Sequence, residues 1–180
     1  MMKKTILFVI LLSACLSVSA QKYVSENSHI RFYSSAPVED IEAVNTGSKS
    51  VIDKENGAFA FSIPNNQFEF KKKLMQEHFN ENYMESEKYP KSTFTGKVEN
   101  WDATAGDKTV VASGQLTIHG VTTQVSTTAQ LSIQGERMIV DSTFPVALAE
   151  YKIKIPKALF YNIADTVEVT VHFEYVPLPK

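Results

Sequence analysis

The chain has 180 residues, of which 43% are hydrophobic, and its 20 acidic and 18 basic side chains give a net charge of −2. This balance does not favour binding to nucleic acid or to an anionic membrane surface. The only cysteine is Cys15, so an intrachain disulfide and a site of several thiolates are both excluded.

The first 20 residues have the pattern of a secretory signal peptide. Lys3 and Lys4 form a positive segment, residues 6–18 are apolar, and small residues precede Gln21. This order of segments is typical of a cleaved leader. The sequence therefore predicts a signal peptide over residues 1–20, a domain over residues 21–180, and export to the periplasm or the extracellular space.

An alternative reading of the leader is lipidation. Residues 12–15, Leu-Ser-Ala-Cys, resemble the bacterial lipobox, in which the cysteine becomes the lipid-modified N-terminus. The apolar run continues past Cys15, which favours ordinary cleavage. Membrane contact is expected only if Cys15 is lipidated, because acyl chains would then tether the domain.

Alternation of apolar and polar residues predicts strands along most of the remaining chain. The clearest case is residues 121–134, where every second side chain is apolar or small; with residues 109–119 they form a hairpin that turns at His119-Gly120. Eight strands are predicted, over residues 22–33, 43–53, 58–63, 93–101, 109–119, 121–134, 137–144 and 166–175.

Two segments depart from the strand pattern. Residues 71–84 predict a short amphipathic helix whose inner face carries Leu74, Met75, His78, Phe79 and Asn82. Residues 146–163 predict an irregular stretch outside the sheet, because prolines 145 and 156 flank it. Its aromatic residues are Tyr151, Phe160 and Tyr161.

The expected fold is all-β and consists of one domain. Eight antiparallel strands are the number at which a closed barrel encloses packed side chains or one small ligand, as in lipocalin-like folds. A two-sheet sandwich has the same alternation, so the pattern alone leaves both architectures open. We expect an eight-stranded antiparallel lipocalin-like β-barrel with one short amphipathic helix.

Several motifs resemble the YceI-like family of bacterial secreted proteins. They are the run Gly114 to Val121 (GQLTIHGV), the pair His78-Phe79, the pair Tyr89-Pro90 ahead of Thr93-Phe94, and the start of the last strand at Asp165-Thr166-Val167. The resemblance implies a lipocalin-type barrel that holds a polyisoprenoid chain in a hydrophobic tunnel. Residues 34–43 depart from the usual form of the family, which implies a divergent branch.

The sequence offers no constellation typical of catalysis or metal binding. His29, His78, His119 and His172 lack the spacing that metal ligands usually show. Serine-nucleophile, phosphate-loop and zinc-protease motifs do not occur in the sequence. We therefore expect no enzyme, no catalytic residue, no metal and no cofactor.

An aromatic-rich segment, residues 59–79, predicts a ligand-binding wall. Its rings exceed what a short helix and its neighbouring strand need for their own contact. In a barrel with a lid they would surround the tunnel mouth, and His78 would contact a ligand head group or a buried polar group. The predicted ligand-binding residues are Phe59, Phe61, Ile63, Phe68, Phe70, Leu74, Met75, His78, Phe79, Phe94 and Phe173.

Two functions of different classes follow. The first is a non-enzymatic carrier that holds a polyisoprenoid or another long apolar lipid, such as a fatty amphiphile. The alternative is a ligand-free structural or protein-interaction module of the bacterial envelope, in which the rings fill the barrel and the aromatics of residues 147–161 form a docking patch. The expected partner is thus a lipid, with a homodimer as a further possibility and nucleic acid excluded.

Overall fold

The computed structural model describes residues 22–35, 39–155 and 163–179, and most of them lie in strands. The strands are β1 (Lys22–Ser34), β2 (Ile41–Asn45), β3 (Lys49–Asp53), β4 (Ala58–Pro64), β5 (Glu69–Phe70), β6 (Lys91–Val98), β7 (Gly106–Ile118), β8 (Val121–Gln134), β9 (Arg137–Ala147) and β10 (Thr166–Pro177). The helical segments are η1 (Asn65–Gln67), α1 (Lys73–His78), η2 (Phe79–Tyr83) and η3 (Leu148–Tyr151).

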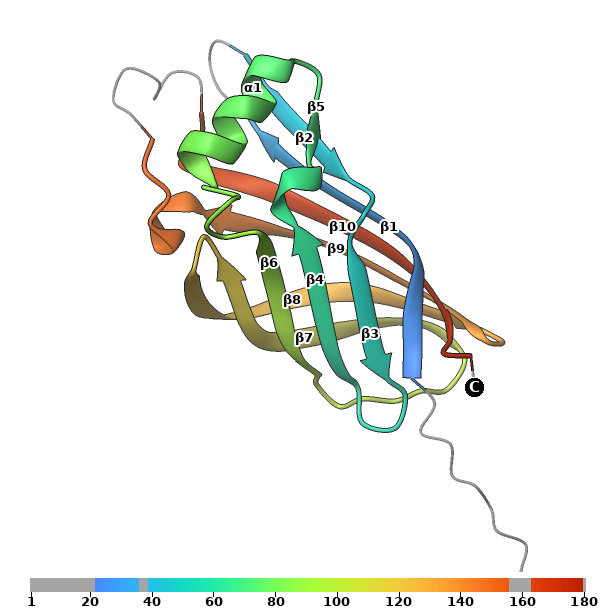
Figure 1. Cartoon of the computed structure of the whole chain (residues 1–180). Coiled ribbons are helices and arrows are strands. Elements are labelled where there is room, and N and C mark those ends of the chain that lie inside the picture. Colours follow the sequence, from blue (N-terminus) through green and yellow to red (C-terminus); the bar gives the residue numbers. More distant parts are fainter. Residues whose placement is uncertain (1–21, 36–38, 156–162, 180) are drawn as a thin grey trace, which may run out of the picture.

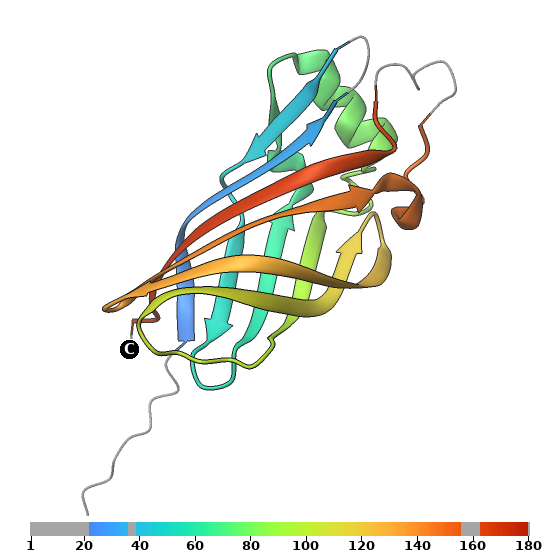
Figure 2. The same ribbon diagram turned by 180° about the vertical axis from the view of Figure 1, so that it is seen from behind.

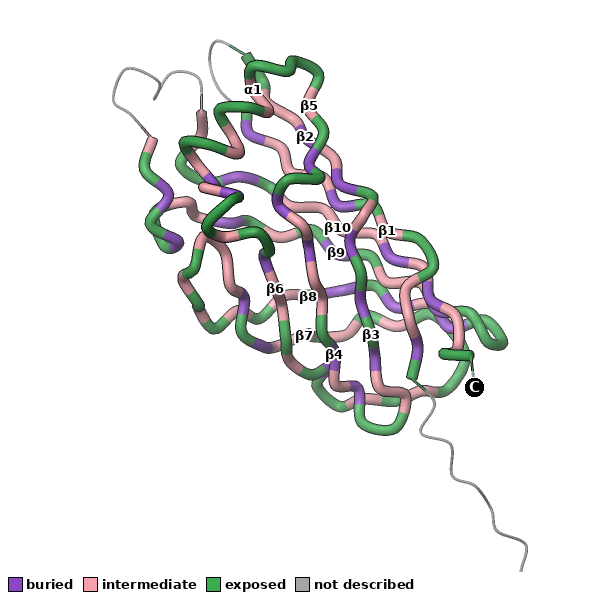
Figure 3. The backbone as a smooth tube through the Cα atoms, in the orientation of Figure 1, coloured by how far each residue is buried: buried purple, intermediate pink, exposed green. Residues whose placement is uncertain are grey.

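The strands close into a barrel. Antiparallel pairing runs in the order β10, β9, β8, β7, β6, β4, β3, β1, and β1 then pairs with β10 to complete the circle. Figures 1 and 2 show this wall from two sides, with α1 over one end. Buried and exposed positions alternate along the strands (Figure 3). The predicted eight-stranded antiparallel barrel is confirmed, and the sandwich is not observed.

The predicted strand over residues 43–53 is in fact two strands. The Asn45 side-chain oxygen accepts hydrogen bonds from the Gly47 backbone N–H (3.0 Å) and the Ser48 hydroxyl (2.9 Å). This local turn bends the chain between β2 and β3. As a result, β3 pairs with the start of β1, whereas β2 pairs with its end and carries the short strand β5 outside the barrel circle.

The barrel wall opens between β8 and β9. Their ladder ends at the pair Ala129–Ser142; beyond it β8 pairs only with β7, and β9 only with β10. Tyr151 of η3 fills this gap, and its hydroxyl lies 2.6 Å from the Thr123 hydroxyl of β8. We call the end of the barrel with this gap and α1 the mouth.

The region near the gap corrects the prediction for residues 146–163. Strand β9 continues through Pro145 to Ala147, which the split wall permits because one side of β9 has no partner there. Tyr151, expected in an exposed patch, is only 1% exposed. Phe160 and Tyr161, the other aromatics of that patch, lie outside the described residues.

Large side chains seal the end opposite the mouth, which we call the narrow end. The buried residues there include Tyr23, Met138, Phe173 and Tyr175. The Tyr175 hydroxyl donates a hydrogen bond of 2.8 Å to the Ser50 hydroxyl, and burial raises the pKa of Tyr175 well above its usual range. Its polar atom therefore stays neutral and satisfied inside the plug.

A hydrogen-bonded cluster ties three mouth segments together. The His119 ring, at the β7–β8 turn, has Nε2 2.7 Å from a Glu85 carboxylate oxygen and Nδ1 3.2 Å from the Tyr151 carbonyl oxygen. Tyr89 packs edge-on against the same ring at 4.7 Å between centroids. The cluster thus joins the β7–β8 hairpin, the loop after η2, and η3, whose Tyr151 fills the wall gap.

Gly120 completes this cluster by leaving room for Tyr89. Its φ is +72°, in the region that favours glycine, and a Cβ added there would lie 2.4 Å from Tyr89 Cε1. Gly135, at the β8–β9 turn, has a similar φ of +62°, but no atom lies within 4 Å of an added Cβ. Both glycines thus have a positive φ, but only Gly120 lacks room for a side chain.

In the described residues, no helix is long and apolar enough to cross a membrane.

We expect Gly120→Ala to destabilise the protein more than Gly135→Ala. Both changes place a side chain at positive φ, which costs on the order of 1–2 kcal/mol. Only Gly120→Ala must also displace the Tyr89 ring, which adds roughly 1–3 kcal/mol. Urea unfolding of the two variants measures the difference, and equal losses of unfolding free energy would contradict the packing of Tyr89 on this turn.

The outer face of β10 supplies a prediction on pH. His172 Nδ1 lies 2.7 Å from Asp141, and this hydrogen bond is the main cause that raises the His172 pKa above its usual value of 6.5. The charged pair therefore stabilises the fold below the unfolded-state pKa, and this stability is lost as pH rises through the folded-state pKa. Asp141→Asn should lower the His172 pKa in an NMR titration; an unchanged titration would show that the pair does not form in solution.

Candidate functional site

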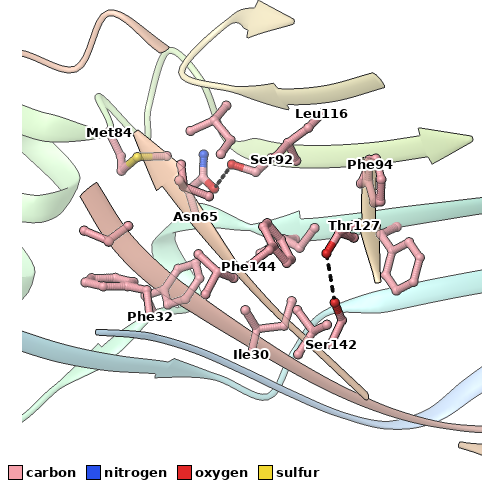
Figure 4. Close-up of a pocket in the computed structure, with 18 of the residues that line it drawn as sticks. Ile30, Phe32, Asn65, Met84, Ser92, Phe94, Leu116, Thr127, Ser142 and Phe144 are labelled. Atoms are coloured by element: carbon pink, nitrogen blue, oxygen red, sulfur yellow. Dashed lines mark hydrogen bonds between the residues drawn. The ribbon is translucent and has the colours of Figure 1, made fainter. Parts of the chain in front are cut away.

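The candidate site is a cavity inside the barrel. Its volume is about 340 Å³, within the range of small-molecule pockets. Side chains from most barrel strands line it, from Met75 and Phe79 at the mouth to Val98 and Trp101 toward the narrow end. Figure 4 shows part of this wall, with side chains of several strands pointing toward a common space.

The described side chains that line the cavity include no Asp, Glu, Lys or Arg. His78, at the rim, is the one histidine among them. Partial burial raises the pKa of Tyr83, so its phenol stays neutral. The cavity therefore offers an uncharged, mostly apolar environment in which an ionised group would lose its hydration without a partner.

Aromatic rings form the wall of the cavity on the β4 and β6 side. The Phe59 and Phe94 centroids are 4.9 Å apart, and Phe61 contacts both of these rings. The strands are in register there, with Phe61 opposite Phe94. Phe61 also packs at 5.0 Å against Phe173, so this aromatic wall continues into the narrow-end plug.

A second group of rings holds the helix over the mouth. Phe79 of η2 packs against Phe32 of β1 at 5.5 Å and against Phe68 and Phe70 at 5.5 and 5.0 Å. These contacts attach α1 and η2 to the sheet, as the position of α1 in Figure 1 indicates. We call residues 73–84 the lid, since they cover the mouth with Met75, Phe79 and Tyr83 facing the cavity.

The helix face differs in part from the predicted one. Met75, His78 and Phe79 line the cavity, whereas Leu74 is 61% exposed and Asn82 is also exposed. The helix begins only at Lys73 and widens into a π-helical turn after His78, with Met84 N–H donating to the Phe79 carbonyl. This wider turn brings Tyr83 and Met84 inward in place of Asn82.

Nine of the eleven predicted ligand-binding residues line the cavity: Phe59, Phe61, Ile63, Phe68, Phe70, Met75, His78, Phe79 and Phe94. Leu74 points to solvent, and Phe173 is fully buried in the narrow-end plug. The aromatic-rich segment thus forms much of one wall and the lid. Contact of these residues with a ligand stays a prediction.

The prediction missed the lining residues of the remaining strands. Ile30 and Phe32 of β1, Ala112 of β7, Ala129 of β8 and Val169 of β10 all face the cavity. Alternation already marks the inward positions of β7, β8 and β10. A small inward side chain such as Ala112 carries no aromatic signal, although it leaves the space in which a ligand fits.

Polar side chains on the wall are few and hydrogen-bonded. Asn65 is fully buried; it donates to the Tyr89 carbonyl (2.7 Å) and accepts from the Ser92 hydroxyl (2.8 Å), as Figure 4 shows for the second contact. Ser34 accepts from the Ala164 N–H at 2.8 Å. A second polar pair, Thr127 and Ser142, lies halfway along the barrel.

The remaining titratable groups do not converge on the cavity. Within residues 22–35, 39–155 and 163–179, no three His, Cys, Asp or Glu side chains are placed to hold a metal ion. His29 and His172 are on outer strand positions, and His119 belongs to the mouth cluster. The geometry is that of a container for an uncharged apolar molecule.

Solved structures share this architecture. A polyisoprenoid-binding domain from Saccharophagus degradans matches with a TM-score of 0.75 at 19% identity, covering 87% of this chain and 98% of that one. Burkholderia cenocepacia BcnA matches with a TM-score of 0.70 at 15% identity, covering 82% and 95%. A YceI protein of Campylobacter jejuni matches with a TM-score of 0.59 at 15% identity over 100% of both chains.

A comparison with curated proteins found no match by sequence. The sequence pattern of the YceI-like domain, however, matches residues 21–175, which is nearly the whole chain beyond the leader pattern. The motifs that carry the resemblance occupy related places: His119-Gly120 and Tyr89 contact each other at the mouth, and Phe79 anchors the lid. The chain belongs to the YceI-like domain family.

Proposed function

We propose that this protein is a non-enzymatic binding protein that holds a polyisoprenoid or another long apolar lipid inside the barrel. The observation that carries this proposal is the uncharged cavity of about 340 Å³, lined from the lid to Trp101 by inward side chains. Transfer of apolar surface from water into such a space yields about 25 cal/mol per Å² before ordering costs. A long chain-like ligand suits this cavity because its affinity rises with the apolar surface that it buries.

The family membership and one similar structure support the lipid class. The Saccharophagus degradans domain is described as polyisoprenoid-binding, and 98% of its length matches the fold of this chain. The lining chemistry agrees with that class, since none of the described lining residues carries a carboxylate, an ammonium or a guanidinium group. A long hydrocarbon needs no such partners.

The ligand-free structural module has less support. It requires inward rings that interdigitate and fill the barrel, whereas Phe59, Phe61 and Phe94 border open space. It also requires an exposed aromatic patch after β9, but Tyr151 is buried in the wall gap. The homodimer through long edge strands stays a prediction, and the long strands themselves pair within the closed barrel.

A variant that fills the cavity tests the proposal. Ala112 of β7 faces the cavity, and its neighbour Val111 faces outward and is 37% exposed. We expect Ala112→Phe to reduce phytol binding at least tenfold, because the new ring occupies space that the chain would use. Equilibrium dialysis with labelled phytol measures the affinity, and Val111→Phe is the control that adds the same ring outside.

Circular dichroism and thermal unfolding show whether both variants keep the fold. The proposal is contradicted if the wild type does not take up phytol, or if a folded Ala112→Phe protein binds phytol as tightly as Val111→Phe. Either result would favour a barrel that does not use its interior.

We also propose export, with removal of residues 1–20. The support is the order of basic, apolar and small residues in the leader, which is typical of a cleaved signal peptide. The intact mass of the protein from its native cells should correspond to a chain that begins at Gln21. A mass that includes acyl chains on Cys15 would instead establish the lipoprotein, and a mass of the full chain would contradict export by cleavage.

A further inference from the structure

Thr127 and Ser142 form a polar pair on a cavity wall that is otherwise apolar at this depth. Along β8 the next inward residues toward the narrow end are Ala129, Leu131 and Ile133, and Ser142 stands between Val140 and Phe144 on the inner face of β9. Both hydroxyl side chains line the cavity, and Figure 4 shows the dashed line that joins them. Two hydroxyl groups on this apolar wall need a physical explanation.

The Ser142 hydroxyl has a structural role. Its hydroxyl donates a hydrogen bond of 2.7 Å to the Thr128 carbonyl oxygen. The β8–β9 ladder ends at the pair Ala129–Ser142, directly beside the Thr128 carbonyl. This side-chain bond ties β9 to β8 at the point where the wall splits, and the Ser142 donor is thereby used.

Thr127 has no comparable partner. Its hydroxyl lies 3.3 Å from the Ser142 oxygen and 3.4 Å from the Thr128 carbonyl oxygen. Hydrogen bonds between oxygen atoms are normally about 2.5–3.0 Å long, so both contacts are weak. The Thr127 hydrogen is therefore free to turn to a stronger acceptor inside the cavity, where a hydroxyl without a good partner costs free energy.

The acceptor must be uncharged. None of the described lining residues carries a full positive charge, and an ionised phosphate or carboxylate would be buried at this depth without a counter-ion. A neutral oxygen, in contrast, needs only one or two hydrogen bonds to offset its lost hydration. Thr127 supplies the donor, and the Ser142 oxygen retains a lone pair for a ligand hydroxyl.

We propose that Thr127, supported by Ser142, is a subsite for an uncharged oxygen-bearing group, such as a hydroxyl, ether or carbonyl, on an otherwise apolar chain. This inference rests on the proposed function and adds a polar group to the ligand at a defined depth. The tunnel then selects oxygenated lipids over hydrocarbons of the same shape and excludes an ionised head group from its interior.

Two ligands that differ by one group test the subsite. Phytol and phytene share the same branched chain, and only phytol carries a hydroxyl. The proteins are the wild type, Thr127→Val, which removes the hydroxyl at nearly constant shape, and Thr128→Val, which makes the same change at an exposed position on the outer face. Thr127→Ser, a fourth protein, keeps the donor. Equilibrium dialysis gives each affinity.

We expect Thr127→Val to weaken phytol binding about tenfold, as loss of one buried hydrogen bond implies, and to leave phytene binding unchanged or tighter. Thr127→Ser and Thr128→Val should keep the wild-type preference for phytol. Retained phytene binding also shows that the Thr127→Val barrel is folded.

Three results would overturn the subsite. Equal weakening of phytol and phytene by Thr127→Val would assign Thr127 a packing role, and an unchanged preference for phytol would place the oxygen elsewhere. Failure of the wild type to bind either ligand would overturn the proposed function and the subsite together, whereas the first two results leave lipid binding intact.

Discussion

The structure depends on how inward side chains fill a closed barrel. Every second residue of each strand must face the interior, and the volume of these side chains decides whether the interior is packed or hollow. At the narrow end, Tyr23, Met138 and Tyr175 fill it. Halfway along, Gly96 and Gly114 pair across β6 and β7 and contribute no side-chain volume; the Phe59 ring packs against Gly96, where an added Cβ would lie 2.9 Å from Phe59 Cζ.

The gap at the mouth also results from how the barrel closes. Strands that twist apart lose their pairing, and here β8 and β9 separate beyond Ser142. The chain compensates with Tyr151 in the gap and with the Phe32–Phe79 contact that holds the lid. The lid is attached mainly by aromatic rings, and α1 has no buried residue, so we expect the lid to open locally at a lower free energy than the barrel strands.

Strand alternation was sufficient to predict the antiparallel strands and most inward positions, as β8 shows over residues 121–134, but by itself it left a barrel and a sandwich both open. It was not sufficient for features that depend on side-chain hydrogen bonds or on how the elements pack. The break between β2 and β3 follows from the Asn45 turn, the inward place of Tyr151 from the gap between two strands, and the outward place of Leu74 from the late start of α1. The polar pair of Thr127 and Ser142 was also not predicted, because it depends on the distance between side chains of two strands.

A hollow, uncharged barrel of this kind should carry an apolar molecule in the cell. We would purify the protein from the cells that produce it, measure its mass by native mass spectrometry, and then extract it with organic solvent. We expect a stoichiometric, uncharged apolar passenger that is released into the solvent. An empty protein that also fails to take up isoprenoid alcohols or fatty amphiphiles would contradict this expectation and would favour a structural role for the barrel.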